Sequence, residues 1–390
     1  MPFPGWLPVL LGFLTAVGPV STDMYLPAFP AIERALGGEP GAAQATLAAW
    51  FAGLAVGQIT QGALSDRYGR RRPLVIGTAV YTLATAGCAL APDLASLSAL
   101  RLVSAFGGSA SMVIPRAVVR DLADGHAAAR LLSRLMLVMG AAPILAPSLG
   151  SLVMGFAGWR TIFWVCAAYG AACSALVALL LPDTLPRHRR VKLGTGAMLQ
   201  RYGFILRERG FITHTMVGGG VTFSFFAYLG GSPGVFEEIY HLPPAAYGGV
   251  FGCCAIGLIA CSQLNPVLVG RFGIGRVLRG SVRVMLAANL ALLVLAFVRP
   301  AQWWVVAAPI FVAVSTNGFN NPNATVGALS HHQAHAGSAS ALMGTLQFAL
   351  GAVSGLLVGL ASDGTVRPMA ALMFVGALSA NLFDACRPQR

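Results

Sequence analysis

The sequence predicts an all-α membrane protein with twelve transmembrane helices in two pseudo-symmetric six-helix bundles. Apolar residues make up 56% of the chain and charged residues only 10%, which is too few to cover a water-soluble surface. The apolar residues form twelve segments, each near the roughly 20 residues that a helix needs to cross a hydrocarbon core of about 30 Å. One long polar interruption divides these segments into two sets of six.

Short loops separate the apolar segments from one another. In chain order the segments lie near 6–29, 43–64, 73–92, 95–118, 133–157, 159–181, 210–234, 244–268, 276–298, 302–325, 337–361 and 366–385. The position of the polar interruption predicts three parts: an N-terminal half over 1–181, a cytoplasmic central loop over 182–209 and a C-terminal half over 210–390.

The basic residues are distributed unequally between the two sides of the predicted membrane. If the first helix runs outward, all but five of the 26 lysines and arginines fall in cytoplasmic loops or the C-terminus; the exceptions are Arg34, Arg101, Arg160, Arg299 and Arg367. By the positive-inside rule, both termini are cytoplasmic. This distribution accounts for the net charge of +13 without nucleic acid. We expect the lipid bilayer to be the partner.

One loop between apolar segments is densely charged. The stretch from Gly62 to Arg72 holds an acid and four arginines between the second and third segments. A weaker copy, Arg271-Phe272-Gly273, follows the eighth segment as the first copy follows the second. Repeated hydropathy patterns of this kind are typical of transporters with two related halves and a substrate site between them.

Two charges lie well inside apolar segments. Asp23 precedes the outer end of the first segment by six residues, and Arg101 follows the outer end of the fourth by six, so both lie roughly 9 Å below the outer boundary. Pro27 removes the helical partner of the Asp23 carbonyl, and Pro19 interrupts the same helix one turn earlier, which predicts a bend. Such a charge costs on the order of 3 kcal/mol unless it is paired or lines a watery cavity. We predict that Asp23 and Arg101 couple transport to protons; the alternative is a permanent ion pair that only orders two helices.

Polar and aromatic residues of other segments predict a substrate cavity. Its candidate residues are Tyr25, Phe225, Phe226, Tyr228, Asn317, Asn320 and Asn321. The amides could equally serve as hydrogen bonds between helices, and the phenylalanines could face lipid. We expect no metal and no cofactor, because the cysteines show no paired metal spacing and no phosphate-binding Gly-x-x-x-x-Gly-Lys-Ser/Thr sequence is present. Without a convincing nucleophile and base pair, we expect no enzyme.

Four segments resemble the major facilitator superfamily and, within it, the Bcr/CflA type of drug:proton antiporter. They are Ser21-Thr22-Asp23-Met24-Tyr25-Leu26-Pro27, the loop over 62–71, Arg101-Leu102-Val103-Ser104-Ala105-Phe106-Gly107-Gly108, and the run over 337–347. Nearly the whole chain is covered by this resemblance. It implies export of drugs in exchange for protons by alternating access.

The resemblance also implies roles for particular residues. In the superfamily the loop motif is associated with conformational switching, which implies a latch of Gly62, Asp66, Arg67, Gly69, Arg70, Arg71 and Asp121; the alternative is that the arginines only set topology. Gly270 stands where Asp66 would recur, so we expect a latch in the first half only. An antiporter motif of the fifth helix implies a hinge at Pro143, Pro147 and Gly150, although Ala146 and Ser151 replace the motif's usual glycines.

These observations together predict a monomer that exports small lipophilic or amphipathic compounds in exchange for protons. A proton-coupled transporter of one metabolite, such as an amino acid or a sugar, is the alternative. A membrane receptor or scaffold that transports nothing is a third possibility, against which the acid of the first segment and the loop motif argue.

Overall fold

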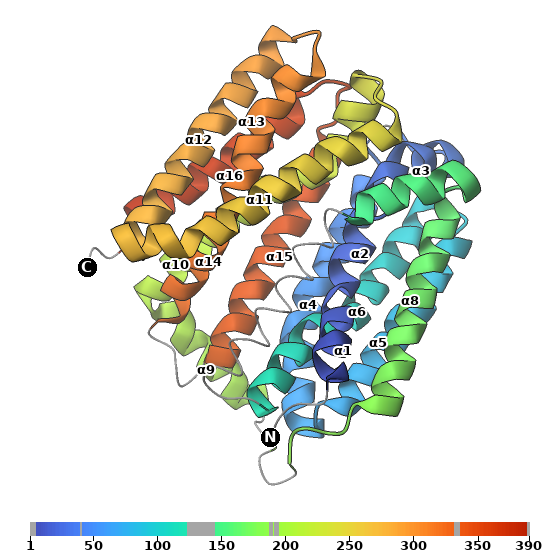
Figure 1. Cartoon of the computed structure of the whole chain (residues 1–390), viewed down its shortest axis with the longest axis vertical. Helices are drawn as coiled ribbons and strands as arrows, with labels where there is room; N and C mark the ends of the chain where they lie inside the picture. Colours follow the sequence, from blue (N-terminus) through green and yellow to red (C-terminus); the bar gives the residue numbers. More distant parts are fainter. Residues whose placement is uncertain are drawn as a thin grey trace. The chain divides into compact units, whose positions relative to one another are not determined.

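A computed structural model describes residues 5–39, 41–122, 145–186, 190, 195–330 and 336–387 (Figure 1). The regular structure of these residues is entirely helical. The chain forms two compact units: unit 1 is Met1–Ala28 with Ala49–Gly194, and unit 2 is Phe29–Ala48 with Thr195–Arg390. The predicted division after residues 181 and 209 stays a prediction.

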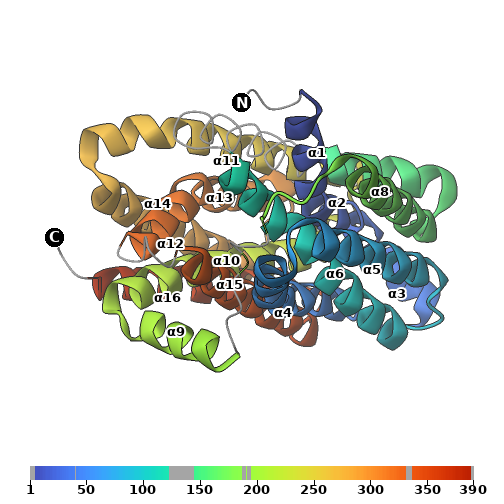
Figure 2. The ribbon, with the colours of Figure 1, turned by 90° about the horizontal axis from the view of Figure 1, so that it is seen from below.

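Unit 1 is a bundle of long helices in which α5 packs against both α6 and α8. Figures 1 and 2 show these three helices side by side. Its elements are α1 (Trp6–Thr15), α2 (Val17–Asp23), η1 (Leu26–Ala28), α4 (Gln44–Tyr68, whose first turn belongs to unit 2), α5 (Arg71–Leu90), α6 (Leu94–Leu122), the helix Leu145–Ala157 and α8 (Trp159–Leu180).

Unit 2 is built around α10, which packs against α16, α15 and α14. A short π-helical turn, η3, directly continues α10. The elements of this unit are α3 (Phe29–Leu36), α9 (Thr195–Arg207), α10 (Arg209–Pro233), η3 (Gly234–Ile239), α11 (Pro244–Phe272), α12 (Ile274–Val298), α13 (Trp303–Ser315), α14 (Asn317–Leu329), α15 (Ala336–Leu360) and α16 (Arg367–Ala385).

Nine spans within the described ranges are long and apolar enough to cross a membrane, and they confirm nine of the predicted segments. The other three segments are also helical where they are described. Segment 210–234 is α10, and segment 302–325 is divided between α13 and α14, which meet at Thr316. Of segment 133–157, only Leu145–Ala157 belongs to the described residues.

The first predicted segment is interrupted twice, as its prolines predict. Helix α1 ends at Thr15 and α2 ends at Asp23, after which the chain forms only a 3-10 turn before α3. In that turn the Ala28 N–H donates to the Tyr25 carbonyl at 2.9 Å. Pro27 has no N–H to offer the Asp23 carbonyl, which explains why the α-helical ladder stops there.

The predicted repeat appears in the local backbone. Helix α4 ends at Tyr68 and α11 ends at Phe272, and the glycine after each helix takes a left-handed conformation, with φ +89° at Gly69 and φ +79° at Gly273. Glycine adopts this conformation without the penalty of a Cβ, so it is the usual residue beyond a helix C-terminus. Each copy therefore ends one long helix and begins the next.

The predicted central loop contains a helix that the sequence pattern did not indicate. Helix α9 covers Thr195–Arg207, and it contacts α10 and α15 of unit 2. Its Ile205 side chain is fully buried and Tyr202 is 9% exposed. The dense positive charge of the preceding residues conceals this short amphipathic pattern, whose apolar face is stabilised by packing and not by its own length.

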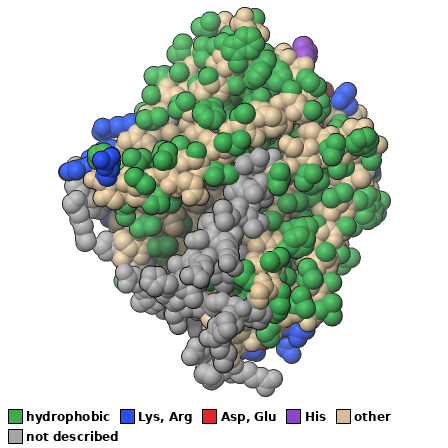
Figure 3. All heavy atoms as spheres, in the orientation of Figure 1, with side chains coloured by type: hydrophobic (Ala, Val, Ile, Leu, Met, Phe, Trp, Pro, Cys, Tyr) green, Lys and Arg blue, Asp and Glu red, His purple; other side chains and the backbone are tan. Residues whose placement is uncertain are grey.

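Large apolar side chains on the surface indicate which parts of the chain face lipid. Phe156, Leu179, Leu360, Leu83 and Val9 are each more than 70% exposed. Figure 3 shows one face, where hydrophobic side chains are spread over the whole described surface and Lys and Arg occur only in isolated places. Apolar exposure on this scale is incompatible with water and is expected of helices in a bilayer.

Candidate functional site

Asp23 is a buried acid at the end of α2, where the helix is interrupted. It is only 6% exposed. Within the described residues its carboxylate neither accepts a hydrogen bond nor forms an ion pair. A carboxylate held inside a membrane span without a partner is costly in its ionised form. Its surroundings therefore favour the protonated acid unless an opposite charge or water arrives.

Arg101 of α6 is held by groups other than Asp23. Its guanidinium carbon lies 4.2 Å from the ring centroid of Tyr25 and 4.3 Å from that of Trp50. One amino group, Nη1, donates to the Ser21 carbonyl at 3.1 Å. Aromatic faces attract a desolvated cation strongly enough, about 2 kcal/mol, to hold it without a carboxylate.

The structure differs from the expectation that Asp23 pairs with Arg101. The two side chains form no ion pair in the described structure, so the alternative of a permanent pair does not hold either. The link between them is indirect and runs through the backbone of Ser21, two residues before Asp23. Nε and Nη2 of Arg101 are buried and have no partner among the described residues, so the guanidinium keeps two donors for another group.

Tyr25, predicted to line a substrate cavity, packs around Arg101, and its role in substrate binding stays a prediction. It is 1% exposed, and its ring centroid lies 5.7 Å from that of Phe163. Phe163 in turn lies under the Arg101 guanidinium at 5.8 Å. The sequence did not single out Trp50 or Phe163, because an aromatic residue in an apolar segment looks the same whether it faces lipid or a buried cation.

The charged loop after α4 forms a compact ionic cluster centred on Arg70. The Arg70 side chain bonds to Asp66 at 2.5 Å and to Asp121 of α6 at 2.8 Å, and it also donates to the Ser65 hydroxyl at 2.9 Å. Arg70 is 5% exposed. Its burial alone would lower its pKa, but the bonds to Asp121 and Asp66 outweigh burial and raise the pKa of Arg70 above its usual value. Arg70 therefore keeps its charge.

Asp183 is a further member of this cluster that the sequence analysis missed. Its Oδ1 accepts from the backbone N–H of Arg70 at 2.9 Å, and its Oδ2 accepts from Arg190 at 2.6 Å. A Cβ on Gly69 would overlap the Asp183 carboxylate, so this approach requires a glycine. Asp183 follows α8 in a proline-rich run, and nothing in the local sequence connects it to a loop more than a hundred residues earlier.

The other predicted latch residues do not join the cluster in the described structure. Arg67 lies over the ring of its neighbour Tyr68 at 5.3 Å, and Arg71 donates to the Ala178 carbonyl. A Cβ on Gly62 would make only an ordinary contact with Val113. Of the predicted latch residues, the described cluster therefore contains Asp66, Arg70 and Asp121, and Gly69 allows Asp183 to approach. That this cluster acts as a latch in conformational switching stays a prediction.

Gly150, predicted as part of a hinge, packs directly against the interruption of the first span. A Cβ on Gly150 would overlap the Met24 carbonyl oxygen, one residue after Asp23. Pro147 lies one turn earlier in the same helix and is buried, and its carbonyl accepts from the Ser151 hydroxyl at 2.9 Å. Pro143 lies outside the described residues.

We expect Gly150→Ala to weaken unit 1 by about 1–3 kcal/mol, the usual cost of an extra methyl group in a filled contact. The methyl would push the helix Leu145–Ala157 away from the backbone at Met24. Gly155→Ala is the matched control, because a Cβ there meets nothing within 4 Å. Thermal unfolding of both variants in the same detergent measures the difference. Equal unfolding midpoints for the two variants would show that the backbone at Met24 can move to accommodate the methyl group without loss of stability.

In unit 2, two of the helix α14 amides bond to neighbouring helices. Asn323 and Asn265 of α11 bond to each other, with Nδ2 of Asn323 donating at 2.8 Å. Asn320 accepts from the hydroxyl of Ser281 in α12. Asn317 donates to backbone carbonyls at the end of α13, and Asn321 is exposed. The geometry of Asn320 fits the alternative that these amides form hydrogen bonds between helices, because its side-chain oxygen already accepts from Ser281 of the neighbouring helix α12.

The predicted aromatic wall of α10 is a packed cluster within unit 2. Phe225 contacts both Phe226 and Tyr228, with ring centroids 5.9 Å and 6.2 Å away. Phe226 stacks on Phe348, and Tyr228 stacks on Phe251. Phe226 and Tyr228 are buried, whereas Phe225 is half-buried, so Phe225 is the member of the three best placed to meet a ligand.

Unit 2 has an ionic cluster of its own, and the expectation that a latch exists in the first half only stays a prediction. Asp384 near the end of α16 is 4% exposed; it pairs with Arg387, and Nε of Arg279 lies 3.3 Å away. Arg387 also donates to the carbonyl of Gly275, beside the second copy of the loop motif, at 3.1 Å. The acid of this cluster comes from α16, outside the motif copy, so the sequence repeat could not reveal it.

Comparison with known proteins identifies relatives along nearly the whole chain. A model described as the Major Facilitator Superfamily matches residues 11–356. The uncharacterized MFS-type transporter YdgK of Bacillus subtilis is 35% identical over 383 residues, which cover 96% of this chain and 94% of that protein. The bicyclomycin resistance protein homolog of Haemophilus influenzae is 29% identical, with 92% and 90% covered. A chloramphenicol resistance protein of Pseudomonas aeruginosa is 28% identical, with 93% and 85% covered.

Solved structures with the same fold are more distant in sequence. A D-xylose-proton symporter superposes with a TM-score of 0.76 at 15% identity and covers 97% of this chain, with 95% of its own chain matched. A bacterial homolog of the human lysosomal transporter Spinster, in an inward-facing state, also gives 0.76 at 13% identity, with 99% and 97% covered. At these identities the likeness establishes the fold alone.

Proposed function

The chain belongs to the Major Facilitator Superfamily and is a multi-pass membrane transporter, and we propose that it exports small lipophilic or amphipathic compounds in exchange for protons. It acts in a bacterial inner membrane, with both termini in the cytoplasm, as the distribution of basic residues predicts. The names of two relatives, which refer to bicyclomycin and chloramphenicol resistance, support a drug as the exported compound.

The observation that carries the proposal is the isolated carboxylate of Asp23 inside the first span. Because no cation pairs with it in the described structure, its ionisation depends on what enters the site. A lipophilic cation or a hydrogen-bonding drug that approaches Asp23 would favour the ionised form and release a proton. Proton and substrate then compete for one group, which is the requirement for exchange.

The proton gradient supplies enough free energy for this exchange. Moving one charge through the membrane potential releases about 2.3 kcal/mol per 100 mV. Each pH unit of gradient adds about 1.4 kcal/mol. With both contributions, one proton can drive a tenfold or larger concentration difference of a neutral compound, since a factor of ten corresponds to about 1.4 kcal/mol.

Expression in a bacterial host that lacks its own drug pumps tests the proposal. Accumulation of some lipophilic cation or neutral drug is expected to fall, and an uncoupler that collapses the proton gradient is expected to restore it. A substrate panel that also includes labelled amino acids and sugars distinguishes drug export from the alternative, transport of a single metabolite. Unchanged accumulation of every drug, with proton-dependent movement of one metabolite, would replace the present proposal by that alternative.

A further inference from the structure

Helix α12 has one face inside unit 2 and the opposite face on the surface. It packs against α16 and α13. Its buried side chains recur along one stripe, which includes Leu278, Met285 and Leu292. The opposite stripe is apolar and exposed, with Val294 at 55% and Phe297 at 62% exposure. A long helix with an exposed apolar stripe of this kind faces lipid.

Two arginines interrupt the exposed stripe near the start of α12. Arg276 and Arg283 are both exposed, and their separation of seven residues places them on the same face as Val294. At about 1.5 Å per residue the 25 residues of α12 extend about 37 Å, so a hydrocarbon core of about 30 Å centred on the helix begins about 4 Å from its first residue. Arg276 then lies at the boundary of the core, and Arg283 is attached about 10 Å inside it.

The protein supplies an acid for only one of the three arginines in this part of α12. Nε of Arg279 lies 3.3 Å from Oδ2 of Asp384. Within the described residues, neither Arg276 nor Arg283 forms an ion pair or a side-chain hydrogen bond. A cation attached inside the hydrocarbon core is costly unless an opposite charge or water reaches it. These two arginines therefore need a partner from outside the protein.

Gly280 leaves open surface between the two arginines. It lies four residues after Arg276 and three before Arg283, so it neighbours both on one face of the helix. A Cβ on Gly280 would meet nothing within 4 Å. Because the Cα–Cβ bonds of a helix tilt toward its N-terminus, the Arg283 side chain leans toward Gly280 and toward the membrane boundary. One anion placed over Gly280 is thus within reach of both guanidinium groups.

We propose that Arg276 and Arg283 together bind the phosphate of an anionic phospholipid over Gly280. A guanidinium group suits phosphate because it presents several donors to the oxygens at once. The acyl chains of such a lipid would lie along the apolar stripe that contains Val284 and Val294. By the predicted orientation this lipid belongs to the cytoplasmic leaflet, where anionic head groups attract basic residues of membrane proteins.

The charges of the site favour an anionic head group over a zwitterionic one. Helix α12 contains no Asp or Glu, so it offers two cations for a phosphate and no acid for an ammonium group. A phosphatidylglycerol head group carries only the negative charge, whereas that of phosphatidylcholine would bring a third cation to the arginines.

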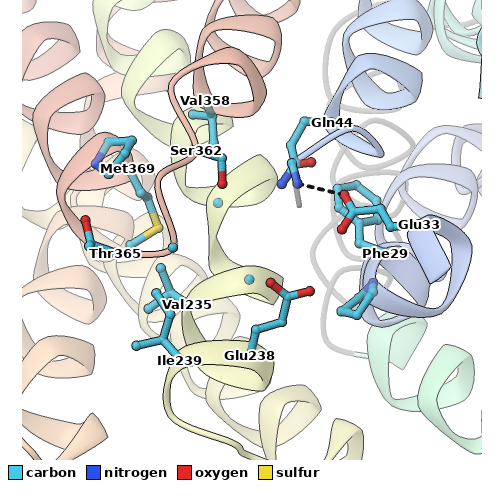
Figure 4. A pocket seen from close by; sticks show the side chains of 16 residues that line it. Phe29, Glu33, Gln44, Val235, Glu238, Ile239, Val358, Ser362, Thr365 and Met369 are labelled. Carbon is cyan, nitrogen blue, oxygen red and sulfur yellow. Dashed lines mark hydrogen bonds between the residues drawn. The ribbon is translucent and has the colours of Figure 1, made fainter. Parts of the chain in front are cut away.

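The pocket at the other end of unit 2 is unsuited to an anion. Figure 4 shows this pocket, of about 40 Å³, between α3, the first turn of α4, η3 and the loop from α15 to α16. Glu33 and Glu238 line it, and its lining includes no Lys, Arg or His. Helix α16 runs from Pro368 at the pocket to Asp384 beside Arg279, roughly 24 Å away. A phosphate would meet carboxylates at the pocket, so we assign it to the arginine end.

Native mass spectrometry of the purified full-length protein in a non-ionic detergent tests the proposal, with phosphatidylglycerol as the probe. Replacing both arginines, Arg276→Gln/Arg283→Gln, is expected to weaken the tightest phosphatidylglycerol site by about 25-fold, since each basic residue near an anionic lipid surface contributes about fivefold. The variant should fold because both side chains are exposed. Phosphatidylcholine with the same acyl chains is expected to bind the unmodified protein more weakly, and inorganic phosphate is expected not to compete.

The net charge of +13 attracts anionic lipids to the whole chain, so two further variants locate the site. Arg201→Gln/Arg207→Gln removes the same charge from α9 of the same unit, and it should bind phosphatidylglycerol normally. Gly280→Leu keeps every charge but fills the space between the arginines. It should fold, because its Cβ meets nothing within 4 Å and leucine favours a helix more than glycine does. We expect it to weaken binding by about fivefold or more, because one arginine is then separated from the phosphate.

Four results would overturn the assignment. An equal loss in the α9 variant would reduce the binding to general attraction by net charge, and unchanged affinity in Gly280→Leu would remove the lipid from the surface over that residue. Equal binding of phosphatidylcholine would contradict an anionic head group, and displacement by inorganic phosphate would assign the arginines to the free ion. Because binding is read without transport, this inference and the proposed export can fail separately.

Discussion

Asp23→Asn is expected to abolish uphill, proton-driven export, down to the level of vesicles without the protein, while substrate binding persists. Asparagine keeps the size and hydrogen-bonding capacity of the acid but cannot release a proton. Asp23 is 6% exposed and has no partner among the described residues, so the substitution removes a titrating group without leaving another charge unpaired. We therefore expect the variant to fold normally and to lose the pH dependence of substrate binding.

Proton release on addition of substrate, followed with a pH dye in detergent, measures this directly. Asp363→Asn is a suitable control, since it makes the same chemical change in an exposed loop, where the described structure shows Asp363 bonded to the nearby Thr365. If Asp23→Asn released as many protons as the unmodified protein, coupling would belong to another acid. Glu33, Glu237 and Glu238 would be the next residues to replace.

Asp121→Asn is expected to disturb the Arg70 cluster more than Asp66→Asn does. The Asp121 side chain is 14% exposed and that of Asp66 is 55% exposed, whereas both bond to a guanidinium that is nearly buried. Removing one partner of a buried pair costs up to about 3–5 kcal/mol, but an exposed pair contributes only about 0–1 kcal/mol. We expect Asp121→Asn to lower stability by up to about 3 kcal/mol, and Asp66→Asn to leave the fold intact and slow transport.

Two measurements separate these effects. Thermal unfolding in detergent ranks the stabilities, and distances between spin labels on the two predicted halves report the conformational population. Arg72→Gln is the control, because Arg72 is an exposed cation of the same loop for which the described structure shows no ion pair. A normal label distribution and normal transport in Asp66→Asn would reduce that acid to a neighbour of Arg70 without a role in switching.

Hydropathy by itself determined the long membrane-spanning helices of this protein, but not the short helix α9. The predicted segments 73–92 and 276–298, which the structure forms as Arg71–Leu90 and Ile274–Val298, are long and apolar, and a bilayer leaves a spanning chain few choices besides a helix. The prolines at 19 and 27 predicted where the first span is interrupted, because the effect of a missing N–H is local. The charged loop after α4 also predicted that Asp66, Arg70 and Asp121 meet, although only the resemblance to a known family suggested why they should.

Only the tertiary structure decided which side chains these charges meet. Arg101 is held by Tyr25, Trp50 and the Ser21 carbonyl and not by Asp23, because a buried cation can be held by aromatic faces that have no charge signature in the sequence. Asp183 and Asp384 complete ionic clusters from distant helices, where no periodicity or spacing connects them to their partners. The side-chain oxygen of Gln44, which has no hydrogen-bond partner among the described residues, is another example, because the sequence does not show whether the neighbours of an amide in space form hydrogen bonds with it. Helix formation depends on neighbours along the chain, whereas a binding site depends on neighbours in space.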